Sequence, residues 1–278
     1  MKLFEKIAIV GTGLIGGSLA QAARKNKLCD RLIGVSRHKA TLEFAKRHKI
    51  IDSGSQDISI LKDADLVILA TPPQTIKILA PKIKKIIKNG CIVTDVASIK
   101  SEIVSSLEKI FPDYIGSHPL AGLEKRGIQN ANARIFNDSL CILTPTKKTS
   151  LEAGRKIKLF WRALGVEVIT MTPKEHDKVL SFVSHLPHVS AFSLMDAIPD
   201  KFLDFAAGGF KDTTRIAASD PELWAEIILG NQKDILYSVG QFKKSLRKIT
   251  SAIRGQNKKA LIAIIKSAKE RREKLNSL

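Results

Sequence analysis

The glycine-rich hexapeptide GTGLIG, which starts at Gly11, is the pattern whose chemistry can be interpreted most directly. It fits the motif GxGxxG and follows a short apolar run that is typical of a buried strand. In this motif Gly11 permits a tight turn, Gly13 lets the backbone approach a pyrophosphate, and Gly16 allows close packing of helix on strand. Leu14 and Ile15 begin the helix, whose first N–H groups can bind phosphate. We therefore expect these five residues to bind a dinucleotide; a tight turn without a ligand is the alternative.

The end of the second predicted strand, residues 31–35, favours NADP over NAD. An NAD site usually places an acidic side chain here, where it accepts hydrogen bonds from the ribose. This chain instead has Ser36 and Arg37, and the planar guanidinium of an arginine can pair with a 2′-phosphate. We expect both residues to contact NADP, with NAD possible; ordinary loop residues are the alternative. Thr71, which ends a further predicted strand at 65–70, is also expected to contact the cofactor.

Four further segments concentrate side chains that can bind or transfer protons. They are TDVASIK at 94–100, GSHPLAG at 116–122, SHLPH at 184–188 and FKDTTR at 210–215. The first two follow predicted parallel strands, and open α/β sheets bind ligands along that edge. The last two lie in the second half of the chain, so we expect a site between the two halves.

Strands and helices alternate over the first 172 residues. The predicted strands are 6–10, 31–35, 65–70, 91–95, 114–117, 140–144 and 166–170, and the predicted helices are 15–26, 41–48, 76–87 and 99–110. This alternation predicts a mostly parallel sheet covered on both faces. We therefore expect an α/β fold whose residues 1–172 form a Rossmann-type dinucleotide-binding domain.

Residues 173–278 carry only helical patterns. Pro173 can start one helix, and residues 219–222 mark the start of another. Either Ser219 and Glu222 form a capping box there, or Asp220 caps the helix with Pro221 at its first position. Apolar residues recur at helical spacing near the end, as at Phe242, Leu246, Ile249 and Ile253. We expect an all-helical domain that takes part in the substrate site and packs a homodimer.

The composition excludes several other classes of protein. The cysteines are three and scattered, at Cys29, Cys91 and Cys141, which argues against a disulfide framework or a zinc site and for the cytoplasm. No apolar run is long enough to span a membrane. The net charge of +19 favours anionic ligands, but the chain shows no nucleic-acid-binding motif. We expect no metal, no membrane contact and no nucleic acid partner.

Taken together, GSHPLAG, SHLPH and FKDTTRIAASDPELW, in this order after the glycine loop, resemble the prephenate/arogenate dehydrogenase family of tyrosine biosynthesis. The resemblance covers nearly the whole chain. It implies oxidation of an anionic cyclohexadienyl substrate with hydride transfer to a nicotinamide cofactor and loss of CO2, giving 4-hydroxyphenylpyruvate or tyrosine. It also implies a helical second domain that builds a dimer.

The resemblance assigns roles to individual residues. His118 corresponds to the base that takes the proton of the substrate hydroxyl, and Ser98 to the serine that hydrogen-bonds this histidine. Arg215 resembles the residue that binds the substrate carboxylate, and His188 and His185 line the substrate pocket of the family. Glu124 follows the GSHPLAG segment and is expected to approach the substrate.

Two other functions fit parts of the pattern. A β-hydroxyacid dehydrogenase shares the glycine loop and a helical second domain, but it relies on a lysine in the helical half rather than a histidine after the sheet. A basic nucleic-acid-binding protein with a vestigial nucleotide fold would account for the charge. Between prephenate and arogenate the sequence does not choose, since the two differ only in a pyruvyl or an alanyl side chain.

Overall fold

The computed structural model describes residues 2–122 and 125–275, and the chain forms two compact units, 1–231 and 232–278. The first unit holds the sheet and also the helices up to residue 231. The predicted domain boundary after residue 172 therefore does not coincide with a break between the compact units. The physical reason is that the helix that follows Thr172 packs directly on a helix of the sheet domain.

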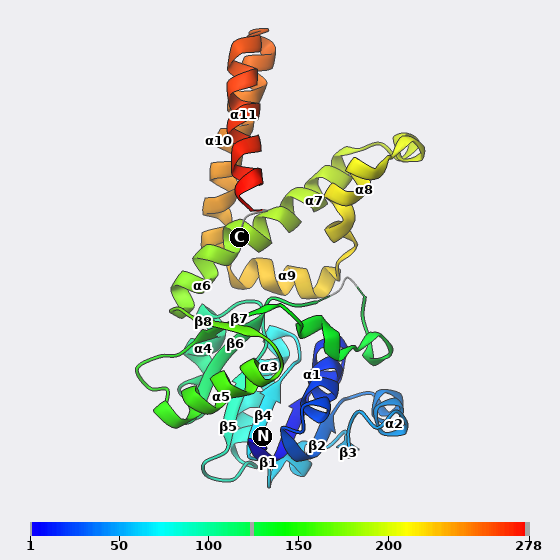
Figure 1. Ribbon diagram of the computed structural model, residues 1–278, viewed down its shortest axis with the longest axis vertical. Coiled ribbons are helices and arrows are strands. Elements are labelled where there is room, and N and C mark those ends of the chain that lie inside the picture. Colours follow the sequence, from blue (N-terminus) through cyan, green and yellow to red (C-terminus); the bar gives the residue numbers. More distant parts are fainter. Residues whose placement is uncertain (1, 123–124, 276–278) are drawn as a thin grey trace. The chain divides into compact units, whose positions relative to one another are not determined.

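An eight-stranded sheet forms the centre of the first unit (Figure 1). Its strands are β1 Phe4–Val10, β2 Cys29–Val35, β3 Ser53–Ser55, β4 Leu66–Leu69, β5 Ile92–Asp95, β6 Tyr114–Pro119, β7 Leu140–Thr144 and β8 Glu167–Thr170. They lie in the order β3-β2-β1-β4-β5-β6-β7-β8, and every neighbouring pair is parallel except β6 with β7. This confirms the predicted mostly parallel sheet, while the short strand β3 has no counterpart in the sequence prediction.

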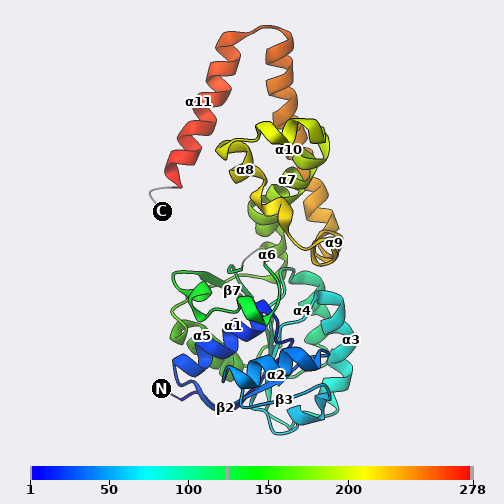
Figure 2. The ribbon, with the colours of Figure 1, turned by 90° about the vertical axis from the view of Figure 1, so that its right-hand side faces the viewer.

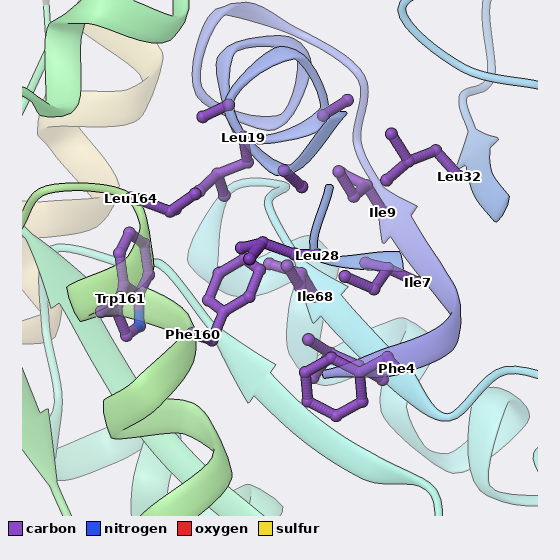
Figure 3. Packing of buried hydrophobic residues seen from close by; sticks show 14 of the residues in the cluster. Phe4, Ile7, Ile9, Leu19, Leu28, Leu32, Ile68, Phe160, Trp161 and Leu164 are labelled. Carbon is purple, nitrogen blue, oxygen red and sulfur yellow. The ribbon is translucent and has the colours of Figure 1, made fainter. Parts of the chain in front are cut away.

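Helices cover both faces of the sheet (Figure 2). They are α1 Leu14–Lys25, α2 Lys39–Arg47, α3 Pro73–Lys84, α4 Ser101–Leu107 and α5 Leu151–Ala163. Alternate residues of a strand point to opposite faces, so Ile7 and Ile9 of β1 join the core under α1 and α5, shown in Figure 3. Ala8 and Val10 join a second core under α3 and α4. The helices packed on both faces hold the strands, and therefore the residues at their ends, in fixed positions.

The strand order creates a crevice at one edge of the sheet. β1 lies between β2 and β4. The chain builds β2 and β3 on one side of β1 and then crosses to build β4 and β5 on the other side. Switch points of this kind bind nucleotides. Val10 pairs with Val35 on one side and Leu69 on the other. The residues that follow these three strands therefore meet at the same edge.

The helices of residues 173–231 begin and end at clear local signals. They are α6 Pro173–Leu180, a π-helix over Ser181–His185, α7 Leu186–Ala197, α8 Gly208–Thr214 and α9 Pro221–Gly230. Thr172 and Glu175 form a capping box at α6, and Asp220 accepts the N–H of Leu223 at 2.7 Å to cap α9. The predicted starts at Pro173 and Pro221 are thereby confirmed, with Asp220 rather than Ser219 as the cap.

The second unit contains α10 Gln232–Arg254 and α11 Lys258–Lys274. The two helices contact each other, and Asn257 caps α11 by accepting the N–H of Ala260 at 2.9 Å. Phe242, Leu246 and Ile253 of the predicted apolar stripe are exposed. No helix among the described residues is both long and apolar enough to cross a membrane.

Candidate active site

The glycine loop has the geometry that a pyrophosphate requires. Gly11 has φ +98°, and a Cβ there would lie 2.6 Å from the carbonyl oxygen of Ala70. A Cβ on Gly16 would lie 2.0 Å from the carbonyl oxygen of Gly11, so only glycine lets α1 approach β1 this closely. In contrast, a Cβ on Gly13 would meet no atom within 4 Å. The surface over Gly13 is therefore open to a ligand.

Polar groups around this loop lack hydrogen-bond partners among the described residues. Gly13 is the N-cap of α1 and no side chain caps the helix, which leaves the first N–H groups, including those of Leu14 and Ile15, available to an anion. The buried hydroxyl oxygens of Thr12 and Thr71 make no hydrogen bond to the described residues. These orphaned groups and the open approach at Gly13 fit a bound dinucleotide.

Ser36 and Arg37 lie directly after β2, beside the glycine loop. The N–H of Gly11 donates to the carbonyl of Val35 at 2.8 Å, which ties the loop to the end of this strand. Arg37 is exposed, and its Nε donates to the ring of His38 at 3.2 Å. The hydroxyl of Ser36 accepts the N–H of His38 at 3.2 Å. An exposed guanidinium next to a dinucleotide loop can bind a phosphate group.

His118 lies on β6 with its ring almost fully buried. Its Nδ1 lies 2.8 Å from Nε2 of His176, a residue of α6 that is completely buried. Burial, with smaller contributions from His176, Lys100 and His185, holds the pKa of His118 well below its usual value of 6.5. Its Nε2 makes no hydrogen bond to any described residue and is not sealed from solvent. The ring is thus a neutral imidazole with one free nitrogen, which is what a general base requires.

Asp177 completes a chain of hydrogen bonds that starts at His118. Its Oδ1 lies 2.8 Å from Nδ1 of His176, and its carboxylate accepts the backbone N–H groups of Lys100 at 2.8 Å and Ser101 at 2.7 Å. Burial alone would raise the pKa of Asp177, but these hydrogen bonds outweigh it and lower the pKa. Neither His176 nor Asp177 was predicted from the sequence; a His-Asp pair early in a helix after the sheet was the available signal.

A buried ion pair anchors the loop that carries Ser98. Lys100, completely buried, pairs with Asp95, which also accepts the hydroxyl of Tyr114 at 2.8 Å and the N–H of Ala97 at 3.0 Å. Ser98 itself is half-buried. Within the described residues it makes no hydrogen bond to His118, whose Nδ1 is taken by His176. The direct role of Ser98 toward this histidine therefore stays a prediction.

His185 and His188 lie on the same helical stretch as His176. His185 is completely buried, and burial lowers its pKa to about 4. Its Nδ1 lies 3.1 Å from Nδ2 of Asn231, an amide donor, so the ring proton is on Nε2. This Nε2 is buried and has no hydrogen-bond partner among the described residues. The π-helix that ends at His185 is a feature that often marks functional sites.

The imidazole of His188 stacks on Trp224 of α9, with ring centroids 3.5 Å apart. Its Nδ1 lies 2.9 Å from the carbonyl of Ser184, so Nδ1 donates and Nε2 is left as an acceptor. Trp224 also contacts His185 edge-on. This aromatic platform was not predicted, because the contact joins α7 to α9.

Arg215 is exposed on the 3-10 helix Arg215–Ala218, and this helix contacts α7, which carries His188. The structure therefore brings the neighbourhood of Arg215 to the predicted pocket residues. Glu124 lies outside the described residues. Among the described residues, no cluster of histidine, cysteine, aspartate or glutamate has the geometry to hold a metal ion.

Comparison with known proteins identifies the family. Residues 19–170 match the model of the prephenate dehydrogenase nucleotide-binding domain, and residues 172–267 match that of the prephenate dehydrogenase dimerization domain. Prephenate dehydrogenase of Bacillus subtilis is 34% identical over 98% of this chain and 76% of that protein. Cyclohexadienyl dehydrogenase of Zymomonas mobilis is 32% identical over 98% of this chain and 96% of that protein.

The fold agrees with this match. The crystal structure of prephenate dehydrogenase from A. aeolicus, in complex with hydroxyphenyl propionate and NAD+, superposes with a TM-score of 0.93 at 34% identity, covering 98% of each chain. The similarity extends over both the sheet, which carries His118, and the helices that carry His176 and His185. This chain belongs to the prephenate dehydrogenase family.

Proposed function

We propose that this protein oxidises prephenate, arogenate or both, with loss of CO2 and transfer of a hydride to NADP+. The observation that carries the proposal is His118, a buried neutral imidazole whose Nε2 is free at the edge of the sheet that forms the dinucleotide crevice. The two curated relatives are named for prephenate and for cyclohexadienyl substrates, which are the same chemical class.

In this proposal each group at the site has one role in the reaction. The cofactor, when bound, accepts the hydride that leaves C4 of the substrate. His118 takes the hydroxyl proton at C4, Ser98 orients the reacting groups, and Arg215 pairs with a substrate carboxylate through its planar guanidinium. His185 and His188 line the pocket with one ring donor and one ring acceptor. Since aromatisation drives the loss of CO2, the protein mainly positions the substrate and supplies a base.

NADP is the preferred cofactor in this proposal. The loop from Gly11 to Gly16 would hold the pyrophosphate, Thr71 would lie beside it, and Ser36 and Arg37 would bind the 2′-phosphate. The exposed guanidinium directly after β2, where NAD enzymes place an acid, supports this preference. The A. aeolicus relative was crystallised with NAD+. We expect Ser36 and Arg37 to determine the preference of this chain for NADP.

The helical half forms a homodimer in this proposal. The match to a dimerization domain over residues 172–267 and the exposed side chains of Phe242, Leu246 and Ile253 support it. We place the enzyme in the cytoplasm, since all three cysteines are free of disulfides.

Steady-state kinetics with prephenate and arogenate, each with NADP+ and NAD+, test the proposal. We expect reduced cofactor to form with at least one substrate, and kcat/KM to be higher with NADP+ than with NAD+. Turnover of simple 3-hydroxyacids in place of both substrates would favour the β-hydroxyacid dehydrogenase alternative. Tight, steeply salt-dependent DNA binding without turnover would favour the nucleic-acid-binding alternative.

A further inference from the structure

The side chains of His118, His176 and Asp177 form one line of hydrogen bonds from β6 to the second turn of α6. Two contacts of 2.8 Å join the three groups, and all three are buried. The proposed reaction uses His118 as its base, and neither His176 nor Asp177 has to touch substrate or cofactor in it. Their geometry instead constrains the ring that does.

The protonation of each ring nitrogen follows from the far end of this line. Asp177 accepts two backbone N–H groups, from Lys100 and Ser101, which holds its carboxylate ionised. An ionised carboxylate only accepts hydrogen bonds, so Nδ1 of His176 must carry a proton. Burial keeps His176 neutral by lowering its pKa, so its Nε2 is an acceptor.

This acceptor then determines the state of His118. Its Nδ1 faces Nε2 of His176 and must donate, which leaves the lone pair of a neutral ring on Nε2. If His118 instead carried its proton on Nε2, its Nδ1 lone pair would face the Nε2 lone pair of His176 in a buried site. The Nε2 of His118 could then not accept a proton from the substrate. The cost of leaving a buried hydrogen bond unmade favours the tautomer of His118 with its proton on Nδ1.

We propose that His176 and Asp177 are positioning residues, which hold His118 as the Nδ1–H tautomer and stabilise the imidazolium it becomes. This inference rests on the proposed function. In the step concerned, the substrate O–H bond breaks, an Nε2–H bond forms on His118, and the electron pair of the C4–H bond leaves as hydride to the nicotinamide. The positive charge on His118 is then shared through His176 toward the Asp177 carboxylate. The charges of Lys100 and His185 oppose the charging of this ring. In this proposal the Asp177 carboxylate, acting through His176, works against them.

The tautomer can be measured directly on the wild-type protein with its histidines labelled with 15N. Near neutral pH, we expect protonated Nδ1 and unprotonated Nε2 on both His118 and His176, assigned by the loss of signals in His118→Asn and His176→Gln. A His118 ring with its proton on Nε2 would overturn the proposal. This measurement needs no turnover, so its outcome is separate from the outcome of the substrate assay.

Kinetics provide the second readout. His176→Leu removes the acceptor and should lower kcat by roughly 10²-fold with KM values within about threefold, since orientation and charge stabilisation of the base are lost. His176→Gln keeps an oxygen acceptor near the position of Nε2. Its kcat should be at least about tenfold higher than that of His176→Leu. His48→Gln, at an exposed histidine outside the site, is the matched control and should match wild type. If wild type turns over and His176→Leu behaves like the control, the positioning role is wrong; if wild type itself is inactive, the proposed function fails while the tautomer result stands.

Discussion

At the scale of single residues, the proposed role of His118 as the base predicts how activity depends on pH. Burial, with contributions from His176, Lys100 and His185, lowers the pKa of this ring below 6.5. Because the base works only when neutral, we expect the acid limb of the pH profile of kcat/KM to lie below pH 6.5. An acid limb above the ordinary histidine range would contradict this assignment.

Removing the imidazole should separate catalysis from binding. We expect His118→Asn to lower kcat by roughly 10² to 10⁴-fold, the usual contribution of a general base, with little change in KM. Steady-state kinetics near neutral pH give both constants, and His48→Gln again serves as the control. A variant that keeps kcat within tenfold of wild type would remove His118 from the mechanism.

Arg37 should control cofactor choice. We expect Arg37→Ala to lower kcat/KM for NADP+ by roughly 10 to 100-fold, as expected for loss of a charged hydrogen bond worth about 1.5–3 kcal/mol. The value for NAD+ should stay within about twofold, since NAD lacks the 2′-phosphate. Equal losses with both cofactors would instead indicate a role in folding or in binding the shared part of the dinucleotide.

Residue types at this scale were largely predictable, and their contacts were not. GSHPLAG singled out His118 because the motif is local. His176 joins it across 58 positions of sequence, and Trp224 reaches His188 from another helix, so both depend on tertiary packing. The buried pair of Lys100 and Asp95, which anchors the loop of Ser98, likewise depends on packing.

At the scale of elements, the strand–turn–helix of residues 4–25 must meet two demands, close packing and access for the cofactor. Gly16 serves the first demand and Gly13 the second. The two glycines therefore offer a matched pair of alanine variants in a single loop.

Gly13→Ala should fold normally, because its added Cβ meets no atom within 4 Å and its φ of −79° suits alanine. We expect an unchanged melting temperature and a raised KM for NADP+, since the methyl group would occupy the approach of the pyrophosphate. Gly16→Ala should lower stability by about 1–3 kcal/mol, the usual cost of overpacking. Thermal melting and cofactor kinetics on both variants test this; a Gly13→Ala enzyme with normal KM would refute the role of Gly13.

The elements themselves were mostly predictable from periodicity and caps. The starts at Pro173 and Pro221 were evident because proline and a capping side chain act locally. The three-residue strand β3 lacks an apolar run and was not predicted. The π-helix Ser181–His185 was not predicted either. It precedes Pro187, which cannot donate a backbone hydrogen bond within the continuous helix.

At the scale of the whole molecule, buried neutral histidines couple stability to pH. The pKa of His185 is about 4 in the folded protein, against 6.5 for an ordinary histidine. As pH falls, the unfolded chain takes up this proton first, so stability is present above pH 6.5 and is lost progressively toward pH 4. His185 alone should contribute on the order of 3 kcal/mol to this loss.

Urea unfolding at a series of pH values tests this linkage. We expect the free energy of unfolding of wild type to fall between pH 6.5 and pH 4, and the fall to be smaller in His185→Gln. The His48→Gln control should keep the wild-type slope. Parallel curves for wild type and His185→Gln would show that His185 is not the group responsible.

The division of the chain was the least predictable feature at this scale. The change from alternating strands and helices to helices alone suggested a boundary after residue 172, and the two family models meet there. The compact units instead divide after Asn231, whose amide donates to the carbonyl of Asp177 at 2.8 Å. The sequence pattern shows where the secondary structure changes. Where the compact units divide depends on tertiary contacts such as this hydrogen bond.

The most direct test of the central claim is the stoichiometry of one turnover assay, in which reduced NADP and released CO2 are measured together with prephenate or arogenate. We expect the two products to form in a one-to-one ratio with wild type, and both to fall together in His118→Asn. Reduced cofactor without CO2, or neither product with either substrate and either cofactor, would contradict an oxidative decarboxylation at this site.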